Sequence, residues 1–142
     1  MRILIVNGPN LNFLGKREKN IYGNRTYDDL IQYLDEYTKS KGIDVIFYQS
    51  NSEGAIIDKL YEVYENVDAI IINGGAYAHT SIAIMDCLKG INKPLVNVHL
   101  TDVNLREEYR HQDYLALVAD KTCMGKGFES YIDAINYLIG KE

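Results

Sequence analysis

The chain has 142 residues, of which 46% are hydrophobic and 25% charged, and its formal net charge is -5. This length favours a single domain, and the composition is ordinary for a soluble globular protein. The negative charge argues against a general nucleic-acid binder or a protein of anionic membrane surfaces, which usually present a basic face. An acidic chain can still bind a small anion through locally placed arginines or backbone amides.

Five short apolar runs predict β-strands that are buried on both faces, as in a parallel sheet. They occupy residues 2–7, 43–49, 68–73, 95–100 and, more weakly, 117–124. None approaches 18 apolar residues, so no membrane span is expected. Cys87 and Cys123 lack the spacing of a metal or redox motif, and two free thiols favour a cytoplasmic setting.

Helical patterns alternate with these runs. They begin at Thr26, at Ser52 or Glu53, at Thr80 or Ser81, and near residue 127. The first should end before Gly42, the third at 89–90 and the last near 139. The alternation predicts an α/β fold, and five strands favour a flavodoxin-like three-layer sandwich with a parallel sheet of order 2-1-3-4-5. We expect one catalytic domain over residues 1–142.

The segment from residue 8 to residue 24 interrupts this rhythm. It shows no clear periodicity and is about three times as long as the usual strand-to-helix connection. Long loops at the carboxyl ends of strands are often functional, and many act as lids. We therefore predict an active-site lid at about residues 13–25.

Polar residues cluster where three of the predicted strands end, which is where open parallel sheets bind ligands. The clusters are residues 7–10, 73–81 and 99–102. The chain has no GxGxxG or GxxxxGK[ST] phosphate loop, no HExxH metal motif and no GxSxG nucleophile elbow. What remains is acid–base chemistry by histidine and tyrosine, with arginine as a fixed positive charge. We expect neither a metal nor a cofactor.

From the residues alone, each candidate also has an ordinary explanation. His99 could be a structural histidine at a strand end, and His79 could cap a helix. Arg17 could be a solvated loop residue, and Arg110 could form a surface ion pair. Tyr22 is one of 12 tyrosines. The pattern does not decide between these readings.

Four motifs favour the functional explanation of these residues over the ordinary one. They are NGPNLNFLGKRE at 7–18, QSNSEG at 49–54, NGGAYAHTS at 73–81, and VHLT followed by REEYR at 98–110. In this order, and with Tyr22-Gly23 after the first, they closely resemble the motifs of type II 3-dehydroquinate dehydratases. The resemblance spans nearly the whole chain, and the motifs together are highly specific.

The resemblance implies a defined reaction. Members of this family dehydrate 3-dehydroquinate to 3-dehydroshikimate by anti elimination through an enolate, without a metal or a Schiff base. By this match Tyr22 removes the proton beside the ketone, and Arg17 holds Tyr22 as a phenolate. Asn10 helps to stabilise the enolate oxygen through a water, and His99 protonates the leaving hydroxyl.

The same resemblance implies how the anionic substrate is bound. The expected binding residues are Asn73, His79, Asp86, Leu100, Thr101 and Arg110. Leu100 and Thr101 would bind the carboxylate, Asp86 would reach a neighbouring subunit's site, and the others would hold ring hydroxyls. The family implies a cytoplasmic shikimate-pathway enzyme built from trimers stacked into a dodecamer, with no nucleic-acid or membrane partner.

One departure from the family pattern bears on the chemistry. Asn97 stands where a glutamate normally precedes the catalytic histidine. Residues two apart on a strand face the same side, so we expect the Asn97 carbonyl to accept a ring N–H of His99 and fix its tautomer. An asparagine cannot favour the imidazolium by charge, which leaves open a non-catalytic flavodoxin-like structural or binding homologue. Ser52, Gly74 and Ala78 also differ from the family pattern, and we expect all three to be tolerated.

Overall fold

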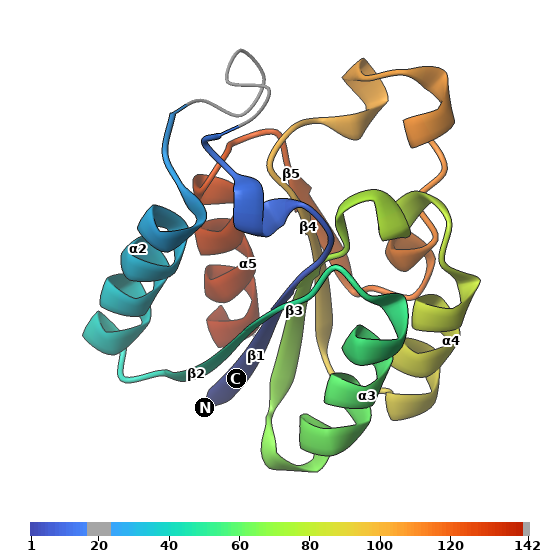
Figure 1. The fold of residues 1–142 in the computed structure, drawn as a ribbon. Coiled ribbons are helices and arrows are strands. Elements are labelled where there is room, and N and C mark those ends of the chain that lie inside the picture. Colours follow the sequence, from blue (N-terminus) through green and yellow to red (C-terminus); the bar gives the residue numbers. More distant parts are fainter. Residues whose placement is uncertain (17–23, 141–142) are drawn as a thin grey trace.

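The computed structural model describes residues 1–16 and 24–140, which form one parallel sheet covered by helices on both faces (Figure 1). The strands are β1 (Arg2–Asn7), β2 (Asp44–Gln49), β3 (Ala69–Asn73), β4 (Leu95–His99) and β5 (Lys121–Met124). They lie in the order β2-β1-β3-β4-β5, and every pairing is parallel. The predicted fold class and strand order are therefore confirmed.

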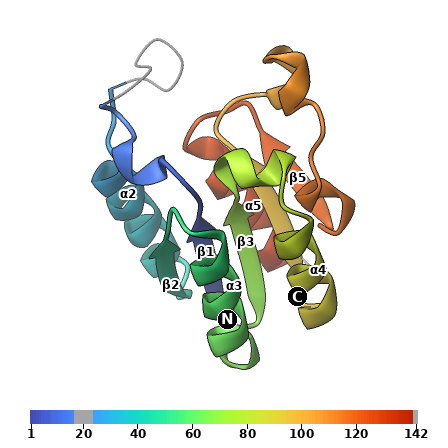
Figure 2. The same cartoon turned by 45° about the vertical axis from the view of Figure 1, so that its right-hand side comes forward.

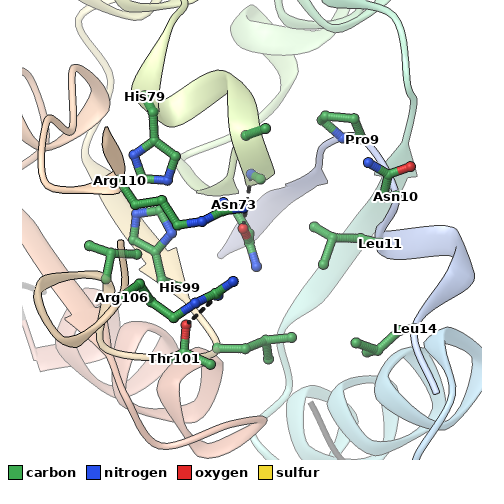
Figure 3. A pocket seen from close by; sticks show the side chains of 14 residues that line it. Pro9, Asn10, Leu11, Leu14, Asn73, His79, His99, Thr101, Arg106 and Arg110 are labelled. Carbon is green, nitrogen blue, oxygen red and sulfur yellow. Dashed lines mark hydrogen bonds between the residues drawn. The ribbon is translucent and has the colours of Figure 1, made fainter. Parts of the chain in front are cut away.

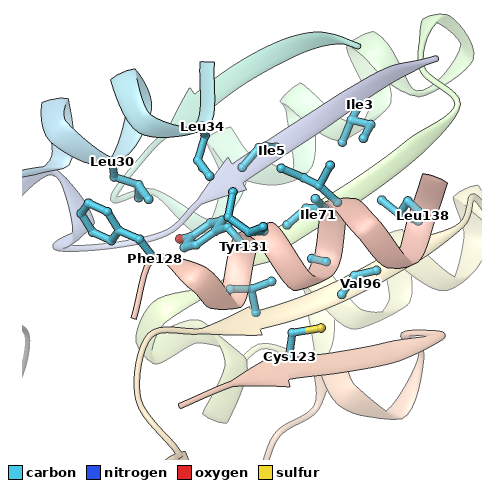
Figure 4. Close-up of a cluster of buried hydrophobic side chains, with 14 of the residues drawn as sticks. Ile3, Ile5, Leu30, Leu34, Ile71, Val96, Cys123, Phe128, Tyr131 and Leu138 are labelled. Atoms are coloured by element: carbon cyan, nitrogen blue, oxygen red, sulfur yellow. The ribbon is translucent and has the colours of Figure 1, made fainter. Parts of the chain in front are cut away.

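The strands are buried on both faces because their apolar runs are continuous. In β1, Ile3 and Ile5 pack with helices α2 (Tyr27–Ser40) and α5 (Glu129–Gly140) (Figure 4). Leu4 and Val6 point to the other face, towards α3 (Glu53–Val63) and α4 (Ile82–Ile91). Figure 2 shows these two helical layers on either side of the sheet. Each face of the sheet therefore packs against its own apolar core.

The helices begin where the sequence places capping residues. Thr26 and Asp29 form a reciprocal capping box at the start of α2. Ser52 accepts a hydrogen bond from the Ala55 N–H, and Ser81 accepts one from the Ile84 N–H. Each of these side chains satisfies a backbone donor that the first helical turn leaves unpaired. None of the helices in the described residues is long and apolar enough to cross a membrane.

The chain between β4 and β5 differs from the prediction. The fifth strand begins at Lys121 rather than at residue 117, because residues 115–117 form a short 3-10 helix that buries Leu115. Two more 3-10 turns precede it, at Val103–Leu105 and Glu108–Arg110. Others are Leu11–Phe13, Tyr64–Asn66 and Gly75–His79. Most of the predicted lid, residues 17–23 of 13–25, lies outside the described residues.

Candidate active site

A cavity lies at the carboxyl edge of the sheet, between the loops that follow β1, β3 and β4 (Figure 3). The candidate residues that line it are Asn10, Asn73, His79, His99, Leu100, Thr101 and Arg110. Asp86 does not line the cavity; it is exposed on α4. Tyr22 and Arg17 lie outside the described residues. The topology thus brings together residues that are up to 100 positions apart in the sequence.

The loop after β1 forms one wall of the cavity and packs tightly against the loop after β3. The Gly8 N–H donates to the carbonyl of Asn73 at 2.8 Å, and a Cβ on Gly8 would lie 2.3 Å from the Gly74 carbonyl oxygen. Only glycine allows this approach. Asn10 then takes a left-handed conformation, with φ of 70°, and its N–H donates to Asn51 Oδ1 at 2.9 Å. This turn brings Asn10 to the rim of the cavity.

The floor of the cavity is a buried hydrogen-bond network. Asn73 at the end of β3 donates from Nδ2 to the Tyr131 hydroxyl at 2.9 Å, and its Oδ1 accepts from the Gly75 N–H at 3.1 Å. The Tyr131 hydroxyl donates in turn to Asn7 Oδ1 at 2.5 Å. Complete burial raises the pKa of Tyr131, so it stays protonated and keeps this donor. Asn73 is therefore fixed from α5 before any ligand arrives.

His99 lies at the end of β4 with only 6% of its side chain exposed, and its partner is Asp113. The distance between His99 Nε2 and Asp113 Oδ2 is 2.8 Å. Asn97 faces the same side, as expected, but the predicted bond from its carbonyl to His99 is wrong. Asn97 instead donates from Nδ2 to Asp113 Oδ2 at 2.8 Å, because a carboxylate is the stronger acceptor and stands between the two side chains.

His79 lies at the end of the 3-10 helix after β3, with its ring stacked on that of His99 at 5.8 Å between centroids. Its Nδ1 lies 2.8 Å from the Gln112 carbonyl oxygen. Burial lowers the pKa of His79 and outweighs the hydrogen bond to the Gln112 carbonyl, which raises it. A neutral His79 that donates from Nδ1 keeps Nε2 as a hydrogen-bond acceptor.

Two arginines supply positive charge to the cavity. Arg110 Nε lies 2.9 Å from Glu107 Oε2, and Arg106 Nε lies 3.5 Å from the same oxygen. Arg106 also reaches Thr101 Oγ1 from Nη1 at 3.4 Å. Glu107 thus orients both guanidinium groups, which can bind an anionic or hydroxylated ligand with several donors each.

Arg106 and Asp113 contact the predicted site residues Thr101 and His99 but were not themselves predicted as site residues. Arg106 belongs to the quoted REEYR motif, so its position there was a usable signal. Asp113 follows His99 by 14 residues, across a segment with no periodicity, and nothing local links the two. Among the described residues, no three histidine, cysteine, aspartate or glutamate side chains gather as metal ligands would.

Comparison with known proteins agrees with this architecture. A 3-dehydroquinate dehydratase of Caldicellulosiruptor bescii is 47% identical over 135 residues, covering 94% of this chain and 93% of that protein. A type II dehydroquinase structure from Butyrivibrio crossotus has 52% identity and a TM-score of 0.95, covering 97% of each chain. A second, from Propionibacterium acnes, has 36% identity and a TM-score of 0.92, covering 96% of this chain and 94% of that one. The family model for class II dehydroquinases matches residues 1–139, and the chain belongs to that family.

Proposed function

We propose that this chain dehydrates 3-dehydroquinate to 3-dehydroshikimate, as the names of its relatives state for those proteins. The observation that carries the proposal is the convergence of His99, Arg110 and Asn73 in one cavity at the sheet edge. This set offers a proton donor, a fixed positive charge and an oriented amide, which suit a hydroxylated carboxylic acid.

The proposed mechanism is an anti elimination through an enolate. Tyr22 removes the proton beside the ketone, and Arg17 stabilises its phenolate, because a phenol alone is mostly neutral at pH 7. An opposite charge at about 4 Å contributes about 4 kcal/mol at an effective dielectric near 20. Asn10, at the cavity rim, helps to stabilise the enolate oxygen through a water. His99 then protonates the leaving hydroxyl.

The ends of the 13–25 segment support the assignment of the base to this loop. Leu14 lines the cavity, and a Cβ on Gly15 would lie 2.7 Å from the Arg25 carbonyl oxygen. The two described ends of the loop therefore meet beside the cavity. Arg17 and Tyr22 belong to the short stretch between these ends, and we propose that it closes over the substrate as a lid.

The polar groups that line the cavity account for substrate binding in this proposal. A ring hydroxyl of the substrate donates to His79 Nε2, and Arg110 and Asn73 donate to ring oxygens. Leu100 and Thr101 bind the carboxylate, with Arg106 beside Thr101 adding positive charge. Neutral His79 fits this role, because a second imidazolium next to His99 would cost electrostatic energy.

We further propose the cytoplasmic trimer-based dodecamer of the family, in which Asp86 reaches a neighbouring subunit's site. Asp86 and Ile82 are four residues apart on α4, so they share a face of the helix, and both are exposed. Light scattering on a size-exclusion column checks the assembly. A monomer that retains full activity would remove Asp86 from the site.

Substrate stereospecifically deuterated beside the ketone tests the reaction. Proton NMR should show 3-dehydroshikimate with the label lost only from the position anti to the departing hydroxyl. A non-catalytic binding homologue would perturb the substrate signals and release no product. Loss of the syn label would keep the dehydration but reject the proposed geometry.

A further inference from the structure

We propose that Asp113 is the positioning residue for His99, fixing its tautomer so that Nδ1 faces the substrate as the proton donor. This proposal rests on the function proposed above and adds to it a residue from the loop between β4 and β5. It follows from the contacts of a single buried carboxylate.

Both oxygens of Asp113 are used by the protein. Oδ2 lies 2.8 Å from His99 Nε2 and also accepts from Asn97 Nδ2 at 2.8 Å. Oδ1 accepts from the Ala116 N–H at 3.2 Å, at the start of the next 3-10 helix. The side chains of His99 and Asn97 and the backbone of a 3-10 helix thus hold the carboxylate in one orientation, and only 10% of its side chain is exposed.

The chemistry of this contact fixes which ring nitrogen carries the mobile proton. An ionised carboxylate has only acceptors, so His99 Nε2 must carry a hydrogen whether the ring is charged or neutral. The proton that His99 can release is therefore the one on Nδ1. Within residues 1–16 and 24–140, His99 Nδ1 has no hydrogen-bond partner, so it remains available to the ligand.

Asn97 supports the carboxylate instead of the imidazole. Its Nδ2 donates to Asp113 Oδ2 and to Thr122 Oγ1, while its buried Oδ1 has no partner in the described part of the chain. Residues 97 and 99 face the same side of β4. A carboxylate at position 97 would therefore approach the place that Asp113 fills from the loop, which makes the two positions exchangeable in principle.

The Asp113 carboxylate supplies the negative charge among the titratable and charged side chains around His99. The described titratable or charged side chains that face His99 are Asp113, His79, Arg106 and Arg110. Burial raises the pKa of Asp113, but the hydrogen bond and charge of His99, with hydrogen bonds from Asn97 and Ala116, outweigh it and hold the pKa below its usual range. Asp113 therefore stays ionised and places a negative charge among the positively charged side chains of the cavity.

The first test is Asp113→Asn, which keeps the shape but removes the charge and half of the acceptor capacity. With 3-dehydroquinate, we expect kcat to fall about 100-fold or more with little change in KM, since an acid catalyst contributes about 10²–10⁴. The alkaline limb of kcat should move down by about one pH unit. Asp58→Asn, at an exposed site on α3, is the matched control and should match the wild type.

The second test moves the carboxylate from the loop to the strand. Asp113→Ala should lose the acid function, and Asn97→Glu in the same chain should recover a tenfold or larger part of the lost kcat. A purely structural role for Asp113 predicts no such recovery. Long-range proton–nitrogen NMR of the His99 ring should find Nε2 protonated at alkaline pH in the wild type, and a changed tautomer in Asp113→Asn.

If Asp113→Asn kept the wild-type kcat, the wild-type alkaline limb of kcat and the wild-type tautomer of His99, the positioning role of Asp113 would be overturned. The proposed dehydratase activity would still stand. The NMR measurement needs no turnover. If the wild type failed to dehydrate 3-dehydroquinate, the proposed function would fall, and the tautomer would still decide the Asp113 assignment.

Discussion

Replacing Tyr131 with phenylalanine should weaken the hydrogen-bond network that forms the floor of the candidate active site. The Tyr131 ring is fully buried on α5 among apolar side chains (Figure 4). Its hydroxyl joins Asn73 of the cavity floor to Asn7 of β1. Tyr131→Phe keeps the packing of the ring and removes only this bridge. It leaves Asn73 Nδ2 and Asn7 Oδ1 buried without their partner.

The expected loss of stability in Tyr131→Phe follows from the number of buried polar groups that lose their hydrogen-bond partner. A buried donor or acceptor that loses its partner costs about 1–3 kcal/mol. Two such groups give a loss of about 2–6 kcal/mol in the free energy of unfolding. Asn73 also loses one of its two anchors and keeps only the Gly75 N–H, so the KM for 3-dehydroquinate should rise several-fold.

Urea unfolding at one protein concentration, with steady-state kinetics beside it, measures both effects. The matched control is Tyr37→Phe, whose hydroxyl donates to Asn136 Oδ1 at the protein surface. Water can replace that bond, so the control should lose less than about 1 kcal/mol and keep its KM. If Tyr131→Phe were no less stable than Tyr37→Phe, the buried network would not hold the cavity floor.

Three variants in the 13–25 segment and one pH series test the site further. Tyr22→Phe should lower kcat by several orders of magnitude with KM largely kept. Arg17→Ala should lower kcat by a comparable factor. Arg17→Lys should recover only part of that loss, since a flexible ammonium does not reproduce the planar guanidinium. Steady-state kinetics check all three, and near-wild-type turnover in Tyr22→Phe would remove the base from its role. Because the pKa of Asp113 is lowered in the folded state, its ionised form stabilises the fold above about pH 4, and that stability is lost as the pH falls through the folded value. The difference in unfolding free energy between wild type and Asp113→Asn should therefore shrink from pH 6 to pH 3, and a constant difference would contradict the coupling.

Local signals in the sequence were enough to predict most of the fold. The strand β1 has the predicted bounds, and the capping box at Thr26 begins α2 where expected. These elements depend on neighbouring residues, either through a continuous apolar run or through a side chain that caps its own helix. The weak fifth strand was placed too early, because burial of Leu115 turns residues 115–117 into a 3-10 helix. Leu115 packs into the apolar core on the side of the sheet that α3 and α4 cover. This packing depends on residues distant in the sequence, so the sequence around Leu115 carries no local signal for it.

The candidate site divides in the same way. His99 ends β4 and His79 lies shortly after β3. Because topology alone brings the ends of parallel strands together, their shared cavity was predictable from the chain order. The partner of His99 was not. The sequence favoured Asn97, two residues away on the same strand face, whereas the fold brings in Asp113 from a loop. Hydrogen bonds across a loop depend on its conformation, and an irregular segment carries no periodic signal.

The most direct test of the proposed activity is to mix the purified protein with 3-dehydroquinate and follow ultraviolet absorbance. The product, 3-dehydroshikimate, contains a conjugated enone that the substrate lacks. We expect absorbance to rise at a rate proportional to protein concentration, and to rise far more slowly with His99→Ala. No increase at high protein concentration, with the substrate recovered intact, would contradict the claim that this chain is a dehydratase.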